Sequence, residues 1–404
     1  MYLEVVGDDG TVHRHQINKE MFDSGKIQKS VGYINSQSKE ANALEIFRVY
    51  FSSGKAVLFD ETNTLLQAQI DALNIDKIDV LDKRKTIFDD EDFTFIYYTS
   101  GSTGIPIAAL KTIENILSEI EVITALLSER QIKKVIVTVP FIHLYGTLFG
   151  LMFPLMNHID VVIKEHFLPF DLIDMIDDNT LVVTTPLYIK ALNKLSETKD
   201  LSKSLFISST APLDADSITL FNEKYQSDIM QIFGSTETGG IAYKMNNTQR
   251  WTPFKGVSID VNEKSELIVT SSFVSNRLFE NNFRDTEGVI ETFDYIEKYE
   301  NNFKLIGRSS KIFKVAGKRY STIQIEHILE SQDDIDKALV FVEMEKEALR
   351  SEYLDITIES QKQYTTREIK KILRDKLSNL KFGIKLHVVD VIPVNRVGKK
   401  LRIT

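Results

Sequence analysis

Short apolar runs alternate with helical patterns through the middle of this chain. Runs rich in β-branched residues predict strands at 135–139, 160–163, 181–185, 204–208 and 229–233. Helical patterns lie between several of these runs, and the clearest predicts a helix over 113–127, where apolar residues recur every three or four positions. Such alternation predicts an α/β fold with a mostly parallel sheet covered by helices.

The two ends of the chain have a different pattern of apolar and polar residues. Residues 1–90 mix polar connectors with a predicted half-helix at 43–50 and a buried strand at 55–59. From about Trp251, short strands at 266–270, 289–292 and 303–306 predict a β-rich subdomain. The tail after Arg308 has the size of a small domain. Its predicted elements are strands at 312–315, 337–343, 353–358 and 385–389 and helices at 323–331 and 366–377. We therefore expect an N-terminal domain over 1–308 and a small, mobile α+β lid domain over 309–404.

Composition narrows the class of protein. The chain has 404 residues, of which 43% are hydrophobic and 26% charged, as is typical of globular proteins with more than one domain. A net charge of −9 argues against general nucleic-acid affinity, which needs a basic surface. The absence of cysteine excludes disulfides and thiolate chemistry and favours a cytoplasmic location. We expect no signal peptide and no membrane span, because the apolar stretch at 148–156 is short and interrupted.

The first candidate for chemistry is the segment Y-T-S-G-S-T-G-I-P at 98–106, directly after an apolar run. Glycine lets the backbone turn sharply, and successive N–H groups form a concave site for an anion. The same residues also suit a flexible connector, so the loop alone does not decide. A P-loop would need Gly-Lys-Ser/Thr, and a dinucleotide fold would need G-x-G-x-x-G after the first strand; this chain has neither.

Further segments carry polar residues suited to nucleotide chemistry. The run F-G-S-T-E-T-G-G at 233–240 places one carboxylate, Glu237, among small residues. Such a carboxylate suits Mg²⁺, which takes many of its oxygen ligands from substrate and water, although it also fits an ordinary acidic loop. The other segments are I-S-S-T-A-P-L at 207–213, G-R at 307–308, K-V-A-G-K-R at 314–319 and G-K at 398–399.

Together these segments resemble the adenylate-forming superfamily of acyl-CoA synthetases, aryl-CoA ligases, luciferases and peptide-synthetase adenylation domains. The loop at 98–106 is similar to its phosphate-binding signature, V-P-F-I-H-L-Y-G at 139–146 to its carboxylate gate, and 233–240 to its threonine–glutamate motif. Residues 307–319 are similar to the hinge and the start of the C-terminal domain, and P-V-N-R-V-G-K-K at 393–400 to the terminal lysine motif. The five matches follow the family's order.

The resemblance implies an AMP-forming acid–thiol ligase. A carboxylate would attack the α-phosphorus of ATP, and a thiol would then displace AMP from the acyl-adenylate. Because the first step brings two anions together, charge neutralisation and positioning would dominate catalysis. The implied cofactors are ATP, Mg²⁺ and either CoA or phosphopantetheine. The implied partners are a small carboxylic acid and, for a carrier-bound thiol, an acyl carrier protein.

The resemblance also assigns roles by position. Catalytic roles fall to Lys399, His143, Thr236 and Glu237, with Glu237 as the metal ligand. Nucleotide binding falls to Thr99, Ser100, Gly101, Ser102, Thr103, Gly104, Ser209, Thr210, Ala211, Pro212, Phe233, Gly234, Asp294 and Arg308. The acid pocket would contain His143, Tyr145, Phe149, Tyr188, Ser208, Thr238, Gly239 and Ile241. Without the resemblance, Lys399 would be interpreted as a solvated tail lysine and His143 as a packed core histidine.

Several positions depart from the family pattern. Ile107 stands where a lysine usually follows the loop proline, and Lys111 either compensates for it or is a surface residue. Ser310 stands at the hinge in place of Asp or Lys, and Val394 in place of a basic residue. Asp294 lies in a reduced motif, with Asp285 as a rival for the ribose. The region before the phosphate loop is shorter than in most relatives, which indicates a compact variant with a trimmed N-terminal subdomain.

The acid and the thiol acceptor stay open at this point. The F-I-H-L-Y-G form resembles aryl-CoA ligases of plants, which favours an aromatic or arylacrylic acid, with a medium-chain fatty acid as the alternative. Loss of the loop lysine also suits a degraded member that acts as a binding or scaffold module. The thiol would enter near Gly317, where a basic cluster either docks an acidic carrier protein or is a solvated face; its members are Lys311, Lys314, Lys318 and Arg319. The tail would rotate about Ser310 between the two half-reactions.

Overall fold

The computed structural model describes residues 1–22, 31–35, 38–80, 83–99, 106–263, 265–308, 312–315, 318–344, 352–376, 383–394 and 400–402. The chain divides into two compact units, which we call the N-terminal unit (Met1–Ile259 and Val269–Ile290) and the C-terminal unit (Asp260–Ile268 and Glu291–Thr404). The domain boundary predicted after Arg308 stays a prediction, because residues 309–311 lie outside the described part. No helix in the described ranges is long and apolar enough to cross a membrane.

The parallel sheet predicted from the middle of the chain is confirmed in the N-terminal unit. In the described part of the chain, this sheet has nine strands in the order β13-β12-β11-β10-β9-β7-β8-β1-β2. The parallel centre consists of β7 (Lys134–Val137), β8 (Asp160–Lys164), β9 (Thr180–Thr184), β10 (Leu205–Ser208) and β11 (Asp228–Ser235). Antiparallel strands β12 (Gly239–Met245) and β13 (Thr252–Pro253) extend one side. The other side carries β1 (Tyr2–Val6) and β2 (Val12–Gln16), a hairpin that the sequence pattern did not predict.

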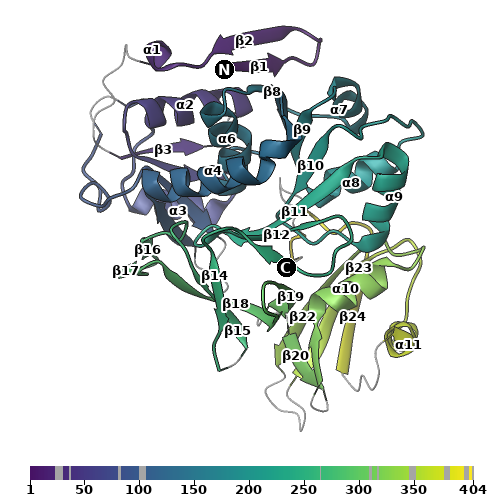
Figure 1. Cartoon of the computed structure of the whole chain (residues 1–404). Helices are drawn as coiled ribbons and strands as arrows, with labels where there is room; N and C mark the ends of the chain where they lie inside the picture. The colour runs from purple at the N-terminus through teal and green to yellow at the C-terminus, as the bar shows by residue number, and fades with distance from the viewer. Residues whose placement is uncertain are drawn as a thin grey trace. The chain divides into compact units, whose positions relative to one another are not determined.

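Helices cover this sheet because their apolar faces have nowhere else to be buried. One hydrophobic cluster joins strand residues such as Val182 and Phe206 to Leu172, Ile189 and Phe221 of three helices. These helices are α7 (Pro169–Met175), α8 (Pro186–Asn193) and α9 (Ala215–Tyr225). Figure 1 shows α4 (Ile113–Leu127) beside α6 (Phe153–Met156) in the same unit. A 3₁₀ turn over Ser128–Arg130 follows α4, while α5 (Leu144–Thr147) and a π-helix over Leu148–Met152 precede α6.

A second sheet in the N-terminal unit carries the predicted phosphate loop. Its strand order is β17-β16-β6-β5-β4-β3. The strands are β3 (Gly32–Asn35), β4 (Ala56–Phe59), β5 (Phe95–Thr99), β6 (Ile107–Lys111), β16 (Arg277–Phe279) and β17 (Phe283–Asp285). Strands β5 and β6 are antiparallel, with Thr99 opposite Ile107. The predicted loop therefore connects two neighbouring strands. The accompanying helices are α1 (Lys19–Phe22), α2 (Lys39–Phe51) and α3 (Thr64–Ala72).

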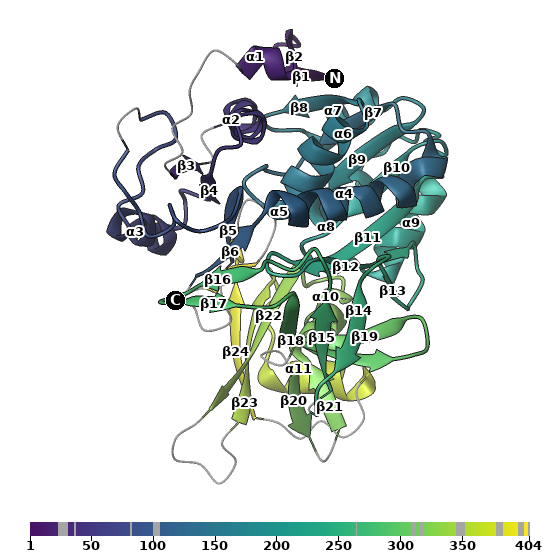
Figure 2. The same ribbon diagram turned by 60° about the vertical axis from the view of Figure 1, so that its left-hand side comes forward.

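The predicted β-rich region and tail are also confirmed. A four-stranded sheet, largely in the C-terminal unit, contains β14 (Ser258–Val261), β15 (Glu266–Thr270), β18 (Val289–Lys298) and β19 (Phe303–Arg308). The hairpin of β20 (Ile312–Val315) and β21 (Lys318–Ser321) comes next in the chain. In Figure 2, β22 (Lys337–Met344), β23 (Glu352–Glu359) and β24 (Gly383–Val389) form one sheet. Helices α10 (Thr322–Glu330) and α11 (Thr366–Lys376) share its hydrophobic cluster.

Candidate functional site

Three predicted segments meet at the carboxyl edge of the parallel sheet. Because β9, β10 and β11 are parallel, their carboxyl ends lie on the same edge, where ligands bind in open α/β sheets. The hydroxyl of Tyr145 donates to the carbonyl oxygens of Thr184 (3.1 Å) and Ile207 (2.8 Å). Ser209 Oγ donates to the carbonyl oxygen of Ile232 at 3.0 Å. The segments 139–146, 207–213 and 233–240 are thus connected through the ends of the strands.

The segment predicted to gate the acid pocket makes a tight turn into α5. Gly146 is required there, because a Cβ at this position would lie 2.1 Å from the carbonyl oxygen of Pro140. His143 precedes α5 and is partly buried; burial lowers its pKa, against the opposing effect of Asp60. Since the ordinary value is 6.5, the imidazole is neutral at pH 7. A neutral imidazole is suited to be part of a polar pocket wall, and it does not supply a fixed positive charge.

The predicted pocket residues do not all share one environment. The rings of Tyr145 and Phe149 lie 5.4 Å apart, and Phe149 is buried in the π-helix. Ile241 is buried on β12, and the Phe233 ring lies 5.5 Å from that of Trp251. Tyr188, by contrast, donates its hydroxyl to the carbonyl oxygen of Phe167 and packs against the cluster under α7–α9. Its contacts therefore link it to helix packing rather than to Tyr145.

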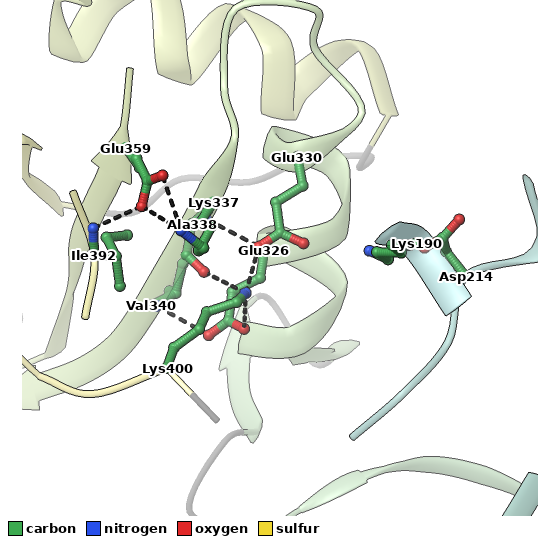
Figure 3. A network of polar contacts seen from close by, with 10 residues as sticks. All are labelled: Lys190, Asp214, Glu326, Glu330, Lys337, Ala338, Val340, Glu359, Ile392 and Lys400. Carbon is green, nitrogen blue, oxygen red and sulfur yellow. Dashed lines mark hydrogen bonds and ion pairs between the residues drawn. The ribbon is translucent and has the colours of Figure 1, made fainter. Parts of the chain in front are cut away.

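The segment predicted to bind adenine leaves the sheet at β10. Ser208 is buried, and its Oγ has no hydrogen-bond partner in the described part of the chain. Thr210, Ala211 and Pro212 are exposed, and Thr210 has a φ of +79°, a left-handed conformation that costs a non-glycine residue energy. The strained turn ends at Asp214, which accepts from Ser217 N at 2.8 Å and pairs with Lys190 (Figure 3).

The threonine–glutamate segment folds into a turn held by its own hydroxyls. Ser235 N donates to Thr238 Oγ1 at 3.0 Å, and Thr238 N donates to Ser235 Oγ at 3.2 Å. Thr238 is fully buried, whereas Thr236 and Glu237 are partly exposed. Gly234 is needed because a Cβ there would lie 2.4 Å from the carbonyl oxygen of Gly239. The turn thus presents Thr236 and Glu237 together.

The surroundings of Glu237 suit a magnesium ion that takes most of its ligands from substrate and water, rather than a metal ion bound by protein ligands alone. No group of three or more His, Cys, Asp or Glu side chains suited to a metal ion occurs among the described residues. A single carboxylate in a turn of small residues suits an ion that keeps several waters and takes phosphate oxygens from its substrate. The role of Glu237 as a metal ligand stays a prediction.

Lys111 lies beneath this turn. It is 1% exposed, and its Nζ donates to the carbonyl oxygens of Glu237 (3.3 Å) and Phe273. Burial lowers its pKa, and the carboxylates of Glu119 and Glu237 oppose that shift. The alternative that Lys111 is a surface residue is therefore wrong, because its ammonium group is bonded inside the fold, and compensation for the missing loop lysine stays a prediction. Sequence reasoning missed Glu119; the signal was its spacing between Ile116, Ile120 and Ile123 on the buried face of α4.

The residues predicted for the ribose lie in the C-terminal unit. Asp294 on β18 is directly opposite Arg308 on β19, so the structure brings these two positions together. Asp294 is 4% exposed, and its backbone N–H donates to Thr292 Oγ1. The Arg308 side chain lies outside the described atoms. The rival Asp285, in the N-terminal unit, is exposed and pairs with Arg277 at 3.2 Å.

The terminal lysine motif is described only at its edges. Lys399, together with Ser100, Gly101, Ser102, Thr103 and Gly104, lies outside the described residues, as do Ser310, Lys311 and Gly317. Thr99, Lys314, Lys318 and Arg319 are described as backbone only. At the end of the motif, Lys400 Nζ donates to Glu330, to Glu326 Oε2 (3.3 Å) and to the carbonyl oxygen of Ala338 (2.6 Å), as Figure 3 shows. Lys400 thereby attaches the end of the chain to α10 and β22.

Comparison with known proteins agrees with this geometry. The family model for AMP-binding enzymes matches residues 22–264. A probable CoA ligase of Humulus lupulus is 24% identical over 345 residues, which cover 77% of this chain and 63% of that protein. A 4-coumarate–CoA ligase of Cereibacter sphaeroides is 26% identical over 254 residues, which cover 62% of this chain and 57% of that protein. The chain thus matches about three fifths of these relatives' lengths.

Solved structures share the fold. ATP-bound MatB from Rhodopseudomonas palustris superposes with a TM-score of 0.79 at 16% identity, over 98% of this chain and 93% of that one. Because the family model matches more than half of the chain, this protein belongs to the family of AMP-binding enzymes, within the adenylate-forming superfamily. The fold class and the resemblance inferred from the sequence are confirmed.

Proposed function

We propose that this protein is an ATP-dependent acid–thiol ligase. The observation that carries the proposal is the meeting of segments 139–146, 207–213 and 233–240 at one edge of a parallel sheet, in a member of the AMP-binding family. In the first half-reaction, a carboxylate oxygen bonds to the α-phosphorus of ATP, and pyrophosphate leaves with the electrons of the broken P–O bond. In the second, a thiol sulfur bonds to the acyl carbon, AMP leaves, and the thiol proton passes to solvent.

The chain's residues divide the work as follows. Lys399 would place its ammonium group between the carboxylate and the α-phosphate, where it offsets the repulsion of two anions. The phosphate loop and Thr236 would hold the phosphates, and magnesium held by Glu237 would neutralise their charge. The segment 209–212 would border the adenine, and Asp294 with Arg308 would bind the ribose. His143, Tyr145 and Phe149 would form the wall of the acid pocket.

The acid is proposed to be aromatic or arylacrylic. The partly exposed Tyr145 ring, which lies 5.4 Å from the buried Phe149 ring, offers polarisable surface to a flat acid, in the same segment as a neutral His143. The thiol is CoA or the phosphopantetheine of a carrier protein. A medium-chain fatty acid is the alternative substrate, since an apolar wall also accommodates an alkyl chain.

Trapping of the acyl-adenylate with hydroxylamine tests the proposal. Purified protein is incubated with ATP, Mg²⁺ and matched panels of arylacrylic acids and fatty acids, with ATP omitted as the control. Arylacrylic acids are expected to give the most hydroxamate, and the best acid is then offered CoA and a pantetheinylated carrier protein. A higher yield from fatty acids would reverse the substrate assignment. If no acid gives ATP-dependent hydroxamate, the protein is a binding or scaffold member of the fold.

A further inference from the structure

Two oppositely charged, buried side chains lie beneath the turn that carries Glu237. Lys111 ends β6, and Glu119 lies two turns into α4; they are 1% and 3% exposed. The two elements are joined by Thr112, whose side chain caps α4 by a reciprocal bond with Asn115. Burial of charged groups is expensive unless polar partners compensate, so their contacts indicate what they do.

The pair holds both ends of the turn. Lys111 Nζ donates to the carbonyl oxygen of Glu237 at 3.3 Å, and the same oxygen accepts from Ser275 N at 2.9 Å. Glu119 Oε1 accepts from the backbone N–H of Gly240 at 2.7 Å. A positive group thus satisfies the carbonyl oxygen at the start of segment 237–240, and a negative group satisfies the N–H at its end.

The two glycines of the turn make room for the Glu119 carboxylate. A Cβ at Gly239 would lie 2.5 Å from Glu119 Oε2, and Gly239 also has a φ of +71°. A Cβ at Gly240 would lie 2.9 Å from Glu119 Oε1. The carboxylate, together with Phe273 and Phe254, therefore occupies the space that side chains at 239 and 240 would need. Both glycines are tied to Glu119 and not only to the turn's own conformation.

Asn115 completes the arrangement on the same face of α4. Its Nδ2 donates to the carbonyl oxygens of Ser272 (2.8 Å) and Val274 (3.1 Å), and Lys111 binds that of Phe273 between them. The loop 271–275 is in turn bonded to Glu237 through Ser275. The strand end and helix therefore hold two loops together, one of which carries the predicted magnesium ligand.

We propose that Lys111 and Glu119 are positioning residues that fix the Glu237 turn for binding of magnesium nucleotide. The proposal rests on the function proposed above. The backbone is held at the Glu237 carbonyl group and, three residues later, at the Gly240 N–H, so the carboxylate side chain of Glu237 starts from a fixed point. Loosening the turn should weaken the contribution of magnesium to ATP binding more than it weakens contacts with the rest of the nucleotide.

Calorimetric titration of ATP, in Mg²⁺ and in EDTA, tests this without catalysis, because no acid is present. The main variant is K111M/E119Q, which removes both charges together and so leaves no uncompensated buried ion. The matched control is Lys39→Met, because Lys39 is also buried and donates to two carbonyl oxygens, those of Thr138 and Lys164. If the double variant does not fold, Glu119→Asp keeps the charge and shortens its reach to Gly240 N.

In the parent protein, Mg²⁺ is expected to strengthen ATP binding. In the double variant we expect this gain to fall about tenfold, or about 1.4 kcal/mol, while ATP affinity in EDTA is unchanged. Lys39→Met should keep the full gain, whatever its melting temperature. An undiminished gain in a folded Lys111 or Glu119 variant would overturn the positioning role. Failure of magnesium to affect ATP binding in the parent would instead refute the function on which this inference rests.

Discussion

Two lysines, one in each unit, donate hydrogen bonds to main-chain carbonyl oxygens beside a motif of this family, and each has a glutamate of a helix nearby. Lys111 in the N-terminal unit is 1% exposed and donates to two carbonyl oxygens, with Glu119 nearby on α4. Lys400 in the C-terminal unit keeps 22% of its side chain exposed and pairs with Glu326 and Glu330 of α10. The group around Lys111 is buried and nearly balanced in charge. The group around Lys400 is partly exposed through the lysine and has more carboxylates than ammonium groups.

This difference predicts how far the loss of each lysine affects the structure around it. A dry charge that loses its partner cannot be rescued by water, so the whole surrounding structure is affected. Lys400 keeps part of its side chain exposed, so water or counterions can partly replace its ammonium group, and the effect of losing it should stay local.

The largest effect is expected for Lys111→Met. It leaves Glu119 buried without the nearby cation, which should lower the free energy of unfolding by about 3–5 kcal/mol. The double variant K111M/E119Q should recover most of this loss. Chemical denaturation of the parent, the single variant and the double variant measures both quantities. If the single variant is as stable as the parent, Lys111 does not stabilise the fold by compensating the buried charge of Glu119.

A smaller effect is expected for Lys400→Met. One hydrogen bond from an ammonium group is worth about 1.5–3 kcal/mol, and the partial exposure of Lys400 should keep the loss of its three bonds near that range. The loss should appear in hydrogen exchange at Ala338 and Val340, whose N–H groups donate to Glu330 and Glu326. Arg402→Met is the control, because its guanidinium is 48% exposed and its ion pairs are worth little. Faster exchange throughout the N-terminal unit as well would contradict a local role for Lys400.

The smallest effect is a dependence on pH in the C-terminal unit. Burial would raise the pKa of Glu359, but hydrogen bonds from Lys337 and from Ile392 N hold it below the ordinary 4.5 (Figure 3). A lowered pKa in the folded state stabilises the protein above pH 4.5, and the stabilisation is lost as pH falls through the folded value. We expect less than about 1 kcal/mol. In the Glu359→Gln variant, the melting temperature of this unit should fall less between pH 6 and pH 3 than it does in the parent. An equal fall in parent and variant would show that Glu359 does not contribute to the pH dependence.

The fold was largely predictable because its signals are local. Apolar runs and helical spacing located α4 with its observed bounds, and β15 and β20 likewise. The hairpin of β1 and β2 was not predicted, since much of β2 is exposed and alternates weakly. Its place at the sheet edge depends on pairing with β8, far away in the sequence.

The motifs of the candidate site were predictable from the sequence, but the buried residues that hold these motifs in place were not. Glu237 and Tyr145 stand in segments whose composition suggests chemistry. Lys111 and Glu119 stand in a strand and a helix, where spacing shows burial but not partners. Their partners are backbone groups of Gly240 and Phe273, more than a hundred residues away. Such contacts are created by the tertiary fold, so no local pattern contains them.

ATP–pyrophosphate exchange tests most directly whether this chain joins a carboxylate to AMP. Radiolabelled pyrophosphate should enter ATP only when a substrate acid is present. The Lys399→Ala variant, with unchanged circular dichroism, should slow this exchange by about a hundredfold or more. Equal exchange by parent and variant would contradict the role of Lys399, and no exchange by the parent with any acid would contradict the ligase itself.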